Sequence, residues 1–233
     1  MAEDHLTGEP GARLLDLVAV MDRLRTGCPW DARQTHASLA RFLQEETYEA
    51  LDALDRDDLT ALREELGDVL LQVVFHARIA AERTDGTGWT IDDVADGIIA
   101  KLTRRHPHVF GDVSVTGADE VTANWDAIKA AERAAAGGGR ASALDGVPLA
   151  QPALALAAAV QRRARRAGAP AGLPAGDPRV SDTGAALFDL AARADAAGLD
   201  PEQELRAAAG AFADQVRAWE QEHAAEQENP APG

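Results

Sequence analysis

The feature that most constrains this chain is a carboxylate on the apolar face of a predicted helix. At about 100° per residue, Glu46 lies within about 60° of Leu39 and Phe42, so its side chain points toward the core. Glu49 and Glu45 follow on one side of it, which makes Glu46 the innermost of three acids. An unpaired buried carboxylate costs several kcal/mol or takes up a proton. The pattern therefore predicts a cation beside Glu46.

The next predicted helix carries a second set of polar side chains. Glu65, Asp68, Gln72 and His76 fall within about 80° of arc. Residues 66–81 are otherwise apolar nearly all round, as in a buried central helix or a dimer interface. A short loop joins the two helices, so we expect antiparallel neighbours whose carboxylates face each other. Hard divalent cations that prefer oxygen ligands would reverse the mutual repulsion, which favours Mg²⁺, with Mn²⁺ as a possible substitute.

Ordinary alternatives exist for these polar residues. Acidic side chains on helices usually form solvated faces, and that interpretation accounts for Asp52, Asp55 and Glu64. It does not account for Glu46 among apolar neighbours. A histidine on a buried helix can bond to a neighbour without being part of a site, so both interpretations of His76 stay open.

Long stretches with a period of 3.6 residues and almost no alternating segments predict an all-α fold. In the first half we expect helices over 12–25, from Thr35 as N-cap to residue 54, over 59–82, and from Thr90 to a point before Pro107. In the second half we expect a helix over 149–167 and two more helical patterns within 187–222. The predicted organisation is a catalytic domain at 1–133, a flexible glycine-rich linker at 134–143, a second helical unit at 144–222 and a disordered tail at 223–233.

Composition excludes several classes of function. A net charge of −16 argues against binding nucleic acid polymers, because the surface repels phosphate backbones. No apolar run approaches the roughly 18–20 residues that span a bilayer, which argues against membrane insertion. The single cysteine, Cys28, cannot form an intramolecular disulfide, and the first residues do not form a secretory signal. We expect a cytoplasmic protein.

Basic and aromatic residues supply candidates for substrate binding. Lys101, Arg104 and Arg105 share one helix face and could hold phosphates, or could equally complement the dipole at the end of their helix. Lys129 is a further candidate of the same kind. Trp30 could stack on a nucleobase or pin a turn against the core.

At these residues the chain resembles a known family. The segments EETYE at 45–49 and ELGD at 65–68 resemble the EExxE and ExxD signature of MazG-type all-α pyrophosphohydrolases. Residues 27–31, 34–35, 70–75 and 104–110 also look like MazG segments, so the similarity covers roughly residues 14–129.

The resemblance implies an Mg²⁺-dependent nucleoside triphosphate pyrophosphohydrolase, built as a helical bundle that dimerises through buried helices. It implies that nucleoside triphosphate is cut to monophosphate and pyrophosphate by water attack at the α-phosphorus, in nucleotide-pool house-cleaning. The metal ligands that it implies are Glu46, Glu49, Glu65 and Asp68, with Glu45 as a further ligand or a water-orienting neighbour.

The second half departs from the family pattern. Residues 187–219 resemble the back half of a MazG repeat, but 171–176 read AGLPAG where an EExxE helix would stand. Ala185 takes the place of a ligand aspartate. We therefore expect a degenerate repeat without metal ligands.

Three rival functions follow from the same residues. A di-metal oxidoreductase would need Glu-x-x-His pairs, and the only such spacing is Glu220/His223, far from the acidic cluster. A non-catalytic nucleotide-binding regulatory dimer would keep the fold without turnover. A narrow-substrate relative, acting on dUTP or phosphoribosyl-ATP, would use the same chemistry.

Overall fold

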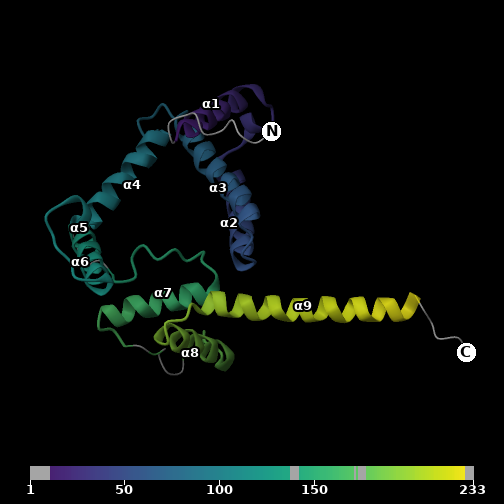
Figure 1. Ribbon diagram of the computed structural model, residues 1–233. Coiled ribbons are helices and arrows are strands. Elements are labelled where there is room, and N and C mark those ends of the chain that lie inside the picture. The colour runs from purple at the N-terminus through teal and green to yellow at the C-terminus, as the bar shows by residue number, and fades with distance from the viewer. Residues whose placement is uncertain (1–10, 137–141, 171, 173–176, 229–233) are drawn as a thin grey trace, which may run out of the picture. The chain divides into compact units, whose positions relative to one another are not determined.

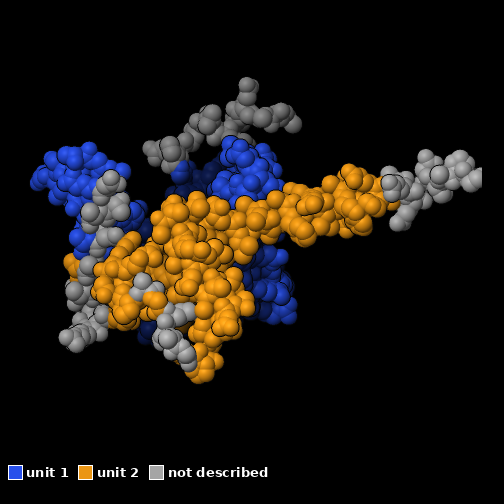
Figure 2. All heavy atoms as spheres, turned by 90° about the horizontal axis from the view of Figure 1, so that it is seen from below, with its two compact units in different colours: residues 1–130 blue, residues 131–233 orange. Residues whose placement is uncertain are grey.

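The computed structural model describes residues 11–136, 142–170, 172 and 177–228. Every regular element within these ranges is a helix, which confirms the predicted all-α class for the described part of the chain. The chain divides into two compact units, residues 1–130 and 131–233 (Figures 1 and 2). Within the described ranges, no helix is long and apolar enough to span a bilayer.

Unit 1 begins with the helices that carry the acidic residues. Helix α1 (Ala12–Gly27) leads through the short 3₁₀ turn η1 (Asp31–Arg33) to α2 (His36–Asp55) and α3 (Leu59–Ala80). Thr35 caps α2 as predicted, and its hydroxyl accepts a bond from the Ser38 amide at 3.1 Å. Asp58 caps α3 through the amides of Thr60 and Ala61, at 3.1 and 3.0 Å. The two caps fix the first turn of each helix, that of α2 at its end far from the α2–α3 turn and that of α3 directly after this turn.

A small apolar core joins α1, α2 and α3. Met21, Leu39, Val74 and Phe75 are its buried members. Arg25 links the end of α1 to the residues that follow α3, because its guanidinium donates to both carboxylate oxygens of Glu82 at 2.7 and 2.8 Å. It also donates to the carbonyl oxygens of Asp31 and Gln34, at 2.5 and 3.0 Å. The turn around η1 is therefore tied to the end of α3.

The remainder of unit 1 is also helical. Helix α4 (Ile91–Arg105) starts at a capping box formed by Thr90 and Asp93. It ends before Pro107, as predicted, and Pro107 begins the short α5 (Pro107–Phe110). Helix α6 (Ala118–Ala136), which continues past residue 130 where unit 1 ends, lies in a stretch where the sequence pattern placed no helix. It runs into the segment 134–143 that was predicted as a linker, and residues 137–141 of that segment lie outside the described residues.

Unit 2 contains α7 (Ala153–Arg166), α8 (Asp182–Ala196) and α9 (Pro201–Glu228). Helix α7 begins later than the predicted residue 149, because Pro152 has no amide hydrogen to give and serves as the N-cap. Helix α9 continues to Glu228, into the segment predicted as a disordered tail, because no helix breaker occurs before Pro230. Residues 229–233 lie outside the described residues. Asp195 joins α7 and α8 by accepting from Arg162 at 2.6 Å and from Arg165.

Candidate metal centre

Helices α2 and α3 run side by side and bring three of the predicted carboxylates together (Figure 1). Glu46 and Glu49 come from α2 and Glu65 comes from α3. Each offers one carboxylate oxygen, and these three oxygens all lie within 4.8 Å of one another. The short turn between the helices makes them antiparallel, so residues that are 16 to 19 positions apart in sequence meet across the helix pair.

The burial of the three acids follows the helical wheel. Glu46 is half-buried, whereas Glu45 and Glu49 on its flank are exposed. Glu65 is half-buried on α3. Glu46 and Glu65 form the more buried side of the cluster, and the exposed Glu49 forms the side that faces solvent.

Electrostatics in the cluster oppose ionisation. Burial raises the pKa of the Glu46 carboxyl first, followed by the negative charges of Asp68, Glu49 and Glu45. Burial likewise raises the pKa of Glu65, followed by repulsion from Glu49, Asp68 and Glu64. Arg56 offsets only part of the second shift. Among the described residues, every charged group that shifts the pKa of Glu46 is an acid.

This donor set fits a hard divalent cation. Carboxylate oxygens from two helices provide the ligands that Mg²⁺ and Mn²⁺ prefer, and an ion would remove the repulsion that raises the two pKa values. The cluster contains neither thiolate nor imidazole, which would favour zinc or copper.

Two predicted site residues lie outside the set of three oxygens. Asp68 is exposed on α3, one turn beyond Glu65, and its charge reaches both Glu46 and Glu65. Glu45 is exposed and contributes to the raised pKa of Glu46. The roles of both as ligands or water-orienting groups stay predictions.

The polar stripe on α3 continues into a histidine pair that the sequence did not indicate. Gln72 is buried, and the Nδ1 atoms of His76 and His36 lie 2.7 Å apart. Burial, and then the neighbouring His36, lower the pKa of His76. The two rings are stacked at 5.0 Å, so His76 is a half-buried histidine bonded to a neighbour. His36 lies forty positions away in sequence, and no local pattern marks such a partner.

The candidate substrate-binding residues lie on other elements. Lys101, Arg104 and Arg105 occupy the last turns of α4. On α6, the Lys129 ammonium stands 4.7 Å from the ring centre of Trp125. The Trp30 ring stands edge-on to Phe42, with centres 5.8 Å apart, and is 46% exposed. Trp30 therefore pins its turn against the core and still offers ring surface to solvent. The binding roles of all five residues stay predictions.

Comparison with known proteins identifies the family to which the helices with the acidic cluster belong. Residues 34–110 match the MazG nucleotide pyrophosphohydrolase domain, a stretch that contains every carboxylate of the cluster. A Thermotoga maritima protein named nucleoside triphosphate pyrophosphohydrolase/pyrophosphatase MazG is 38% identical, over 91% of this chain and 88% of its own length. The chain belongs to the MazG family.

Other MazG relatives differ in length. An uncharacterized 26.1 kDa protein of Streptomyces cacaoi is 52% identical over 91% of this chain and 84% of its own length. A nucleoside triphosphate pyrophosphohydrolase of Mycolicibacterium smegmatis is 48% identical over 90% of this chain, which spans only 60% of that relative. A solved structure of a MazG-related protein from Thermotoga maritima covers 50% of this chain, at 24% identity and a TM-score of 0.43.

Proposed function

We propose that this chain is an Mg²⁺-dependent nucleoside triphosphate pyrophosphohydrolase that releases the monophosphate and pyrophosphate. The observation that carries the proposal is the cluster of Glu46, Glu49 and Glu65, whose oxygens lie within 4.8 Å of one another between two helices. Membership of the MazG family supports the same chemistry, because relatives at 38% and 48% identity carry that activity in their names.

The proposed roles follow from charge and placement. Glu46, Glu49, Glu65 and Asp68 would hold the cation, with Mn²⁺ able to replace Mg²⁺. A bound divalent ion would offset the charge of the triphosphate and acidify a bound water. Glu45, exposed beside the cluster, would orient the water that attacks the α-phosphorus.

Binding groups would come from the rest of unit 1. Lys101, Arg104, Arg105 and Lys129 would hold the phosphates and the charge that develops on the leaving pyrophosphate, so catalysis would be positional and electrostatic. Trp30 would stack on the base with its exposed ring surface.

A homodimer is part of the proposal. Leu43 on α2, together with Leu66 and Val73 on α3, leaves apolar surface exposed on the two helices that carry the carboxylates. On α4, Ile98, Ile99 and Leu102 are exposed as well. Extended apolar faces of this kind mark interaction surfaces, and a second copy would cover them.

The deciding experiment is product analysis by ion-exchange chromatography. The purified chain is incubated with canonical and modified nucleoside triphosphates and Mg²⁺, and we expect monophosphate and pyrophosphate that disappear on chelation. The fastest substrate would distinguish house-cleaning of modified nucleotides from a narrow dUTP or phosphoribosyl-ATP activity.

A matched pair of variants ties the activity to the cluster. Glu46→Gln should abolish turnover, whereas Asp52→Asn, on the same helix but exposed and paired with Arg56 at 2.8 Å, should retain it. Orthophosphate and diphosphate as products, or full turnover by Glu46→Gln, would contradict the proposal. Nucleotide binding without turnover would indicate a regulatory role.

A further inference from the structure

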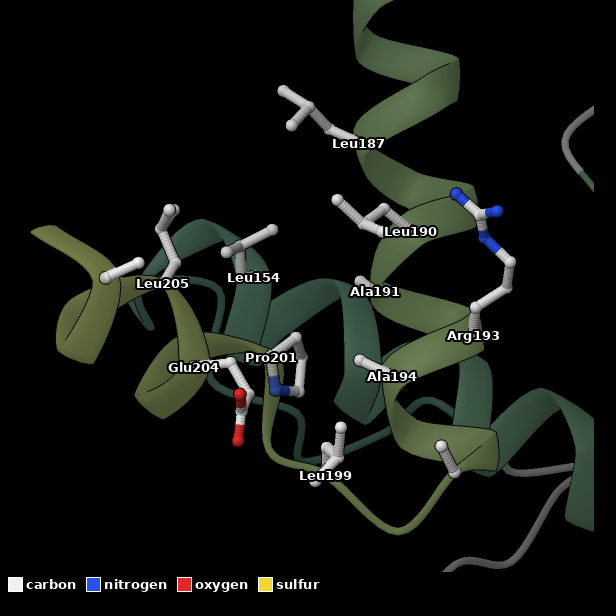
Figure 3. A pocket seen from close by; sticks show the side chains of 12 residues that line it. Leu154, Leu187, Leu190, Ala191, Arg193, Ala194, Leu199, Pro201, Glu204 and Leu205 are labelled. Carbon is white, nitrogen blue, oxygen red and sulfur yellow. The ribbon is translucent and has the colours of Figure 1, made fainter.

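Two features of the molecule take no part in the proposed hydrolysis. One is an apolar pocket of about 550 Å³ between α7, α8 and α9 (Figure 3). Its lining holds one base and one acid, Arg193 and Glu204, so its chemistry does not identify a ligand. The other feature is the contact between His36 and His76, in which two titratable rings of unit 1 meet directly.

The contact joins the start of α2 to the last turns of α3. The Nδ1 atoms of His36 and His76 lie 2.7 Å apart, and their ring planes differ by 1°. At this distance one Nδ1 donates a hydrogen bond and the other accepts it, so the contact holds a single proton. His36 is exposed, whereas His76 is half-buried, and its Nε2 is shielded from solvent without a hydrogen-bond partner among the described residues.

Proton uptake at this contact has two different steps. When His36 is the donor, a first proton can bind to its Nε2, and the hydrogen bond from Nδ1 to His76 is kept. A second proton must bind to Nδ1 of His76, because Nε2 of that ring already carries hydrogen in this arrangement. The second proton removes the acceptor, places two cations side by side and leaves one of them half-buried. The contact therefore accommodates one positive charge and is broken by the second.

The pair receives no help from a neighbouring acid. The charged side chains on the elements packed against this part of α3 have other places: Asp22 binds Arg78, Arg25 binds Glu82, Asp93 binds the Thr90 amide, Asp92 lies in the first turn of α4, and Arg41 of α2 lies over the Phe42 ring. Burial, and then His36, lower the pKa of His76, and no described carboxylate is among the causes of that shift.

His36 also holds the connection between α3 and α4. The Trp89 ring stacks on the His36 ring, with centres 6.2 Å apart and planes 23° apart. The connection itself lies close against the end of α3, since a Cβ at Gly88 would come within 3.0 Å of the Arg83 carbonyl oxygen and 3.1 Å of that of Ala80. Trp89 directly precedes Thr90, the residue that caps α4. The histidine pair is thus linked to the start of α4.

We propose that the His36–His76 pair is a pH-sensitive switch that holds the start of α2 against α3, and Trp89 against His36, until both rings are protonated. Above the ordinary histidine pKa of 6.5, the closed contact keeps its full stability. Below that value an open His76 takes up a proton that the closed one resists, so acid favours the open form. Opening separates the two imidazolium rings and removes the stacking partner of Trp89.

Nitrogen-15 NMR of the full chain, labelled at the histidine rings, tests the shared proton. His36→Asn and His76→Asn assign the two rings among the six histidines. At pH 7.5 we expect one ring with hydrogen on Nδ1, the other with hydrogen on Nε2 alone, and a coupling between the two Nδ1 nuclei through the hydrogen bond. His76 should take up its second proton below pH 6.5, and the coupling should vanish with it. Absence of the coupling at pH 7.5, or its persistence after both rings are protonated, would overturn the proposal.

Fluorine NMR of the chain labelled with 5-fluorotryptophan tests the release of Trp89, whose signal is assigned by Trp89→Phe. Between pH 7.5 and 5 this signal should shift as His76 is protonated. The shift should shrink at least fivefold in His76→Asn, whose amide can bond to His36 but takes up no proton, and likewise in His36→Asn at the exposed ring.

His106→Asn is the matched control for both variants. His106 is another half-buried histidine of unit 1, and its Nδ1 bonds to the carbonyl oxygen of Leu102 at 2.7 Å. This variant should keep the full shift of the Trp89 signal, and circular dichroism at pH 7.5 should show unchanged helix content in all three variants. A wild-type signal that is indifferent to pH, or a full shift in the folded His76→Asn or His36→Asn chain, would show that the histidine pair does not control Trp89.

Discussion

Glu46 shows how burial and charge act on one side chain. Its place on the apolar face of α2 was predictable from helical periodicity, and the structure leaves it half-buried beside Glu49 and Glu65. Burial and neighbouring acids together raise the pKa of its carboxyl. Such a group favours any process that neutralises it, either proton uptake or cation binding.

Metal affinity should therefore depend on pH. Because the pKa values of Glu46 and Glu65 are raised, both carboxyls keep their protons to a higher pH than an ordinary glutamate. A cation binds the ionised form, so Mn²⁺ affinity should fall several-fold as pH falls toward 5, and binding should release protons. Isothermal titration calorimetry at two pH values, in buffers of different ionisation enthalpy, measures both effects. Asp52→Asn should behave as the wild type, and affinity independent of pH would count against the cluster as the site.

Glu82 should make stability depend on pH in the acid range. Its carboxylate accepts from Arg25, whose side chain is only 9% exposed, and this bond lowers the pKa of Glu82. A lowered pKa in the folded state means that the stabilisation is complete above the ordinary value of 4.5 and is lost as pH falls through the lowered pKa. Glu82→Gln should cost about 1 kcal/mol at pH 7 and almost nothing at pH 2.

Urea unfolding of Glu82→Gln and wild type at the two pH values provides the measurement. Asp16→Asn is the control, because its pair with Arg13 is exposed on both sides and should contribute little at either pH. A cost for Glu82→Gln that persists at low pH would mean that the ion pair with Arg25 is not its source.

In unit 1, the sequence predicted the starts of helices best where a capping side chain marks them. Thr35, Asp58 and Thr90 each cap a helix at the expected position, because a cap is a bond between residues two or three apart. Helix α6 was missed, although Val121, Trp125 and Ile128 recur along it at helical spacing. The His36–His76 pair was also missed, since it depends on how α2 and α3 pack together.

The junction of α1 with α3 should be the most sensitive part of the unit 1 core. Met21 is almost fully buried against residues of α2 and α3, so Met21→Ala should destabilise unit 1 by about 2–5 kcal/mol. Leu15→Ala, an exposed position on the same helix, should change stability by less than about 0.5 kcal/mol. Denaturant midpoints of the two variants make the comparison. Similar losses in both would show that another surface covers Leu15 in solution.

At the scale of the whole molecule, the division into two units predicts separable stability. Burial alone would raise the pKa of Asp195, but the hydrogen bonds and charges of Arg162 and Arg165 outweigh it and lower that pKa. All three residues belong to α7 and α8, so their network stabilises unit 2. The carboxylates of the proposed metal centre all lie in unit 1.

Asp195→Asn should therefore destabilise unit 2 and leave the stability of unit 1 unchanged. The amide gives up the charge that both arginines bind, at a cost of about 2 kcal/mol. Hydrogen exchange followed by mass spectrometry should show faster exchange in α7, α8 and α9, unchanged protection in α1 to α3, and unchanged hydrolysis of nucleoside triphosphates. Met21→Ala should give the opposite pattern, with faster exchange confined to unit 1. Equal acceleration in both units by either variant would mean that they unfold as one cooperative body, whatever the division of their contacts.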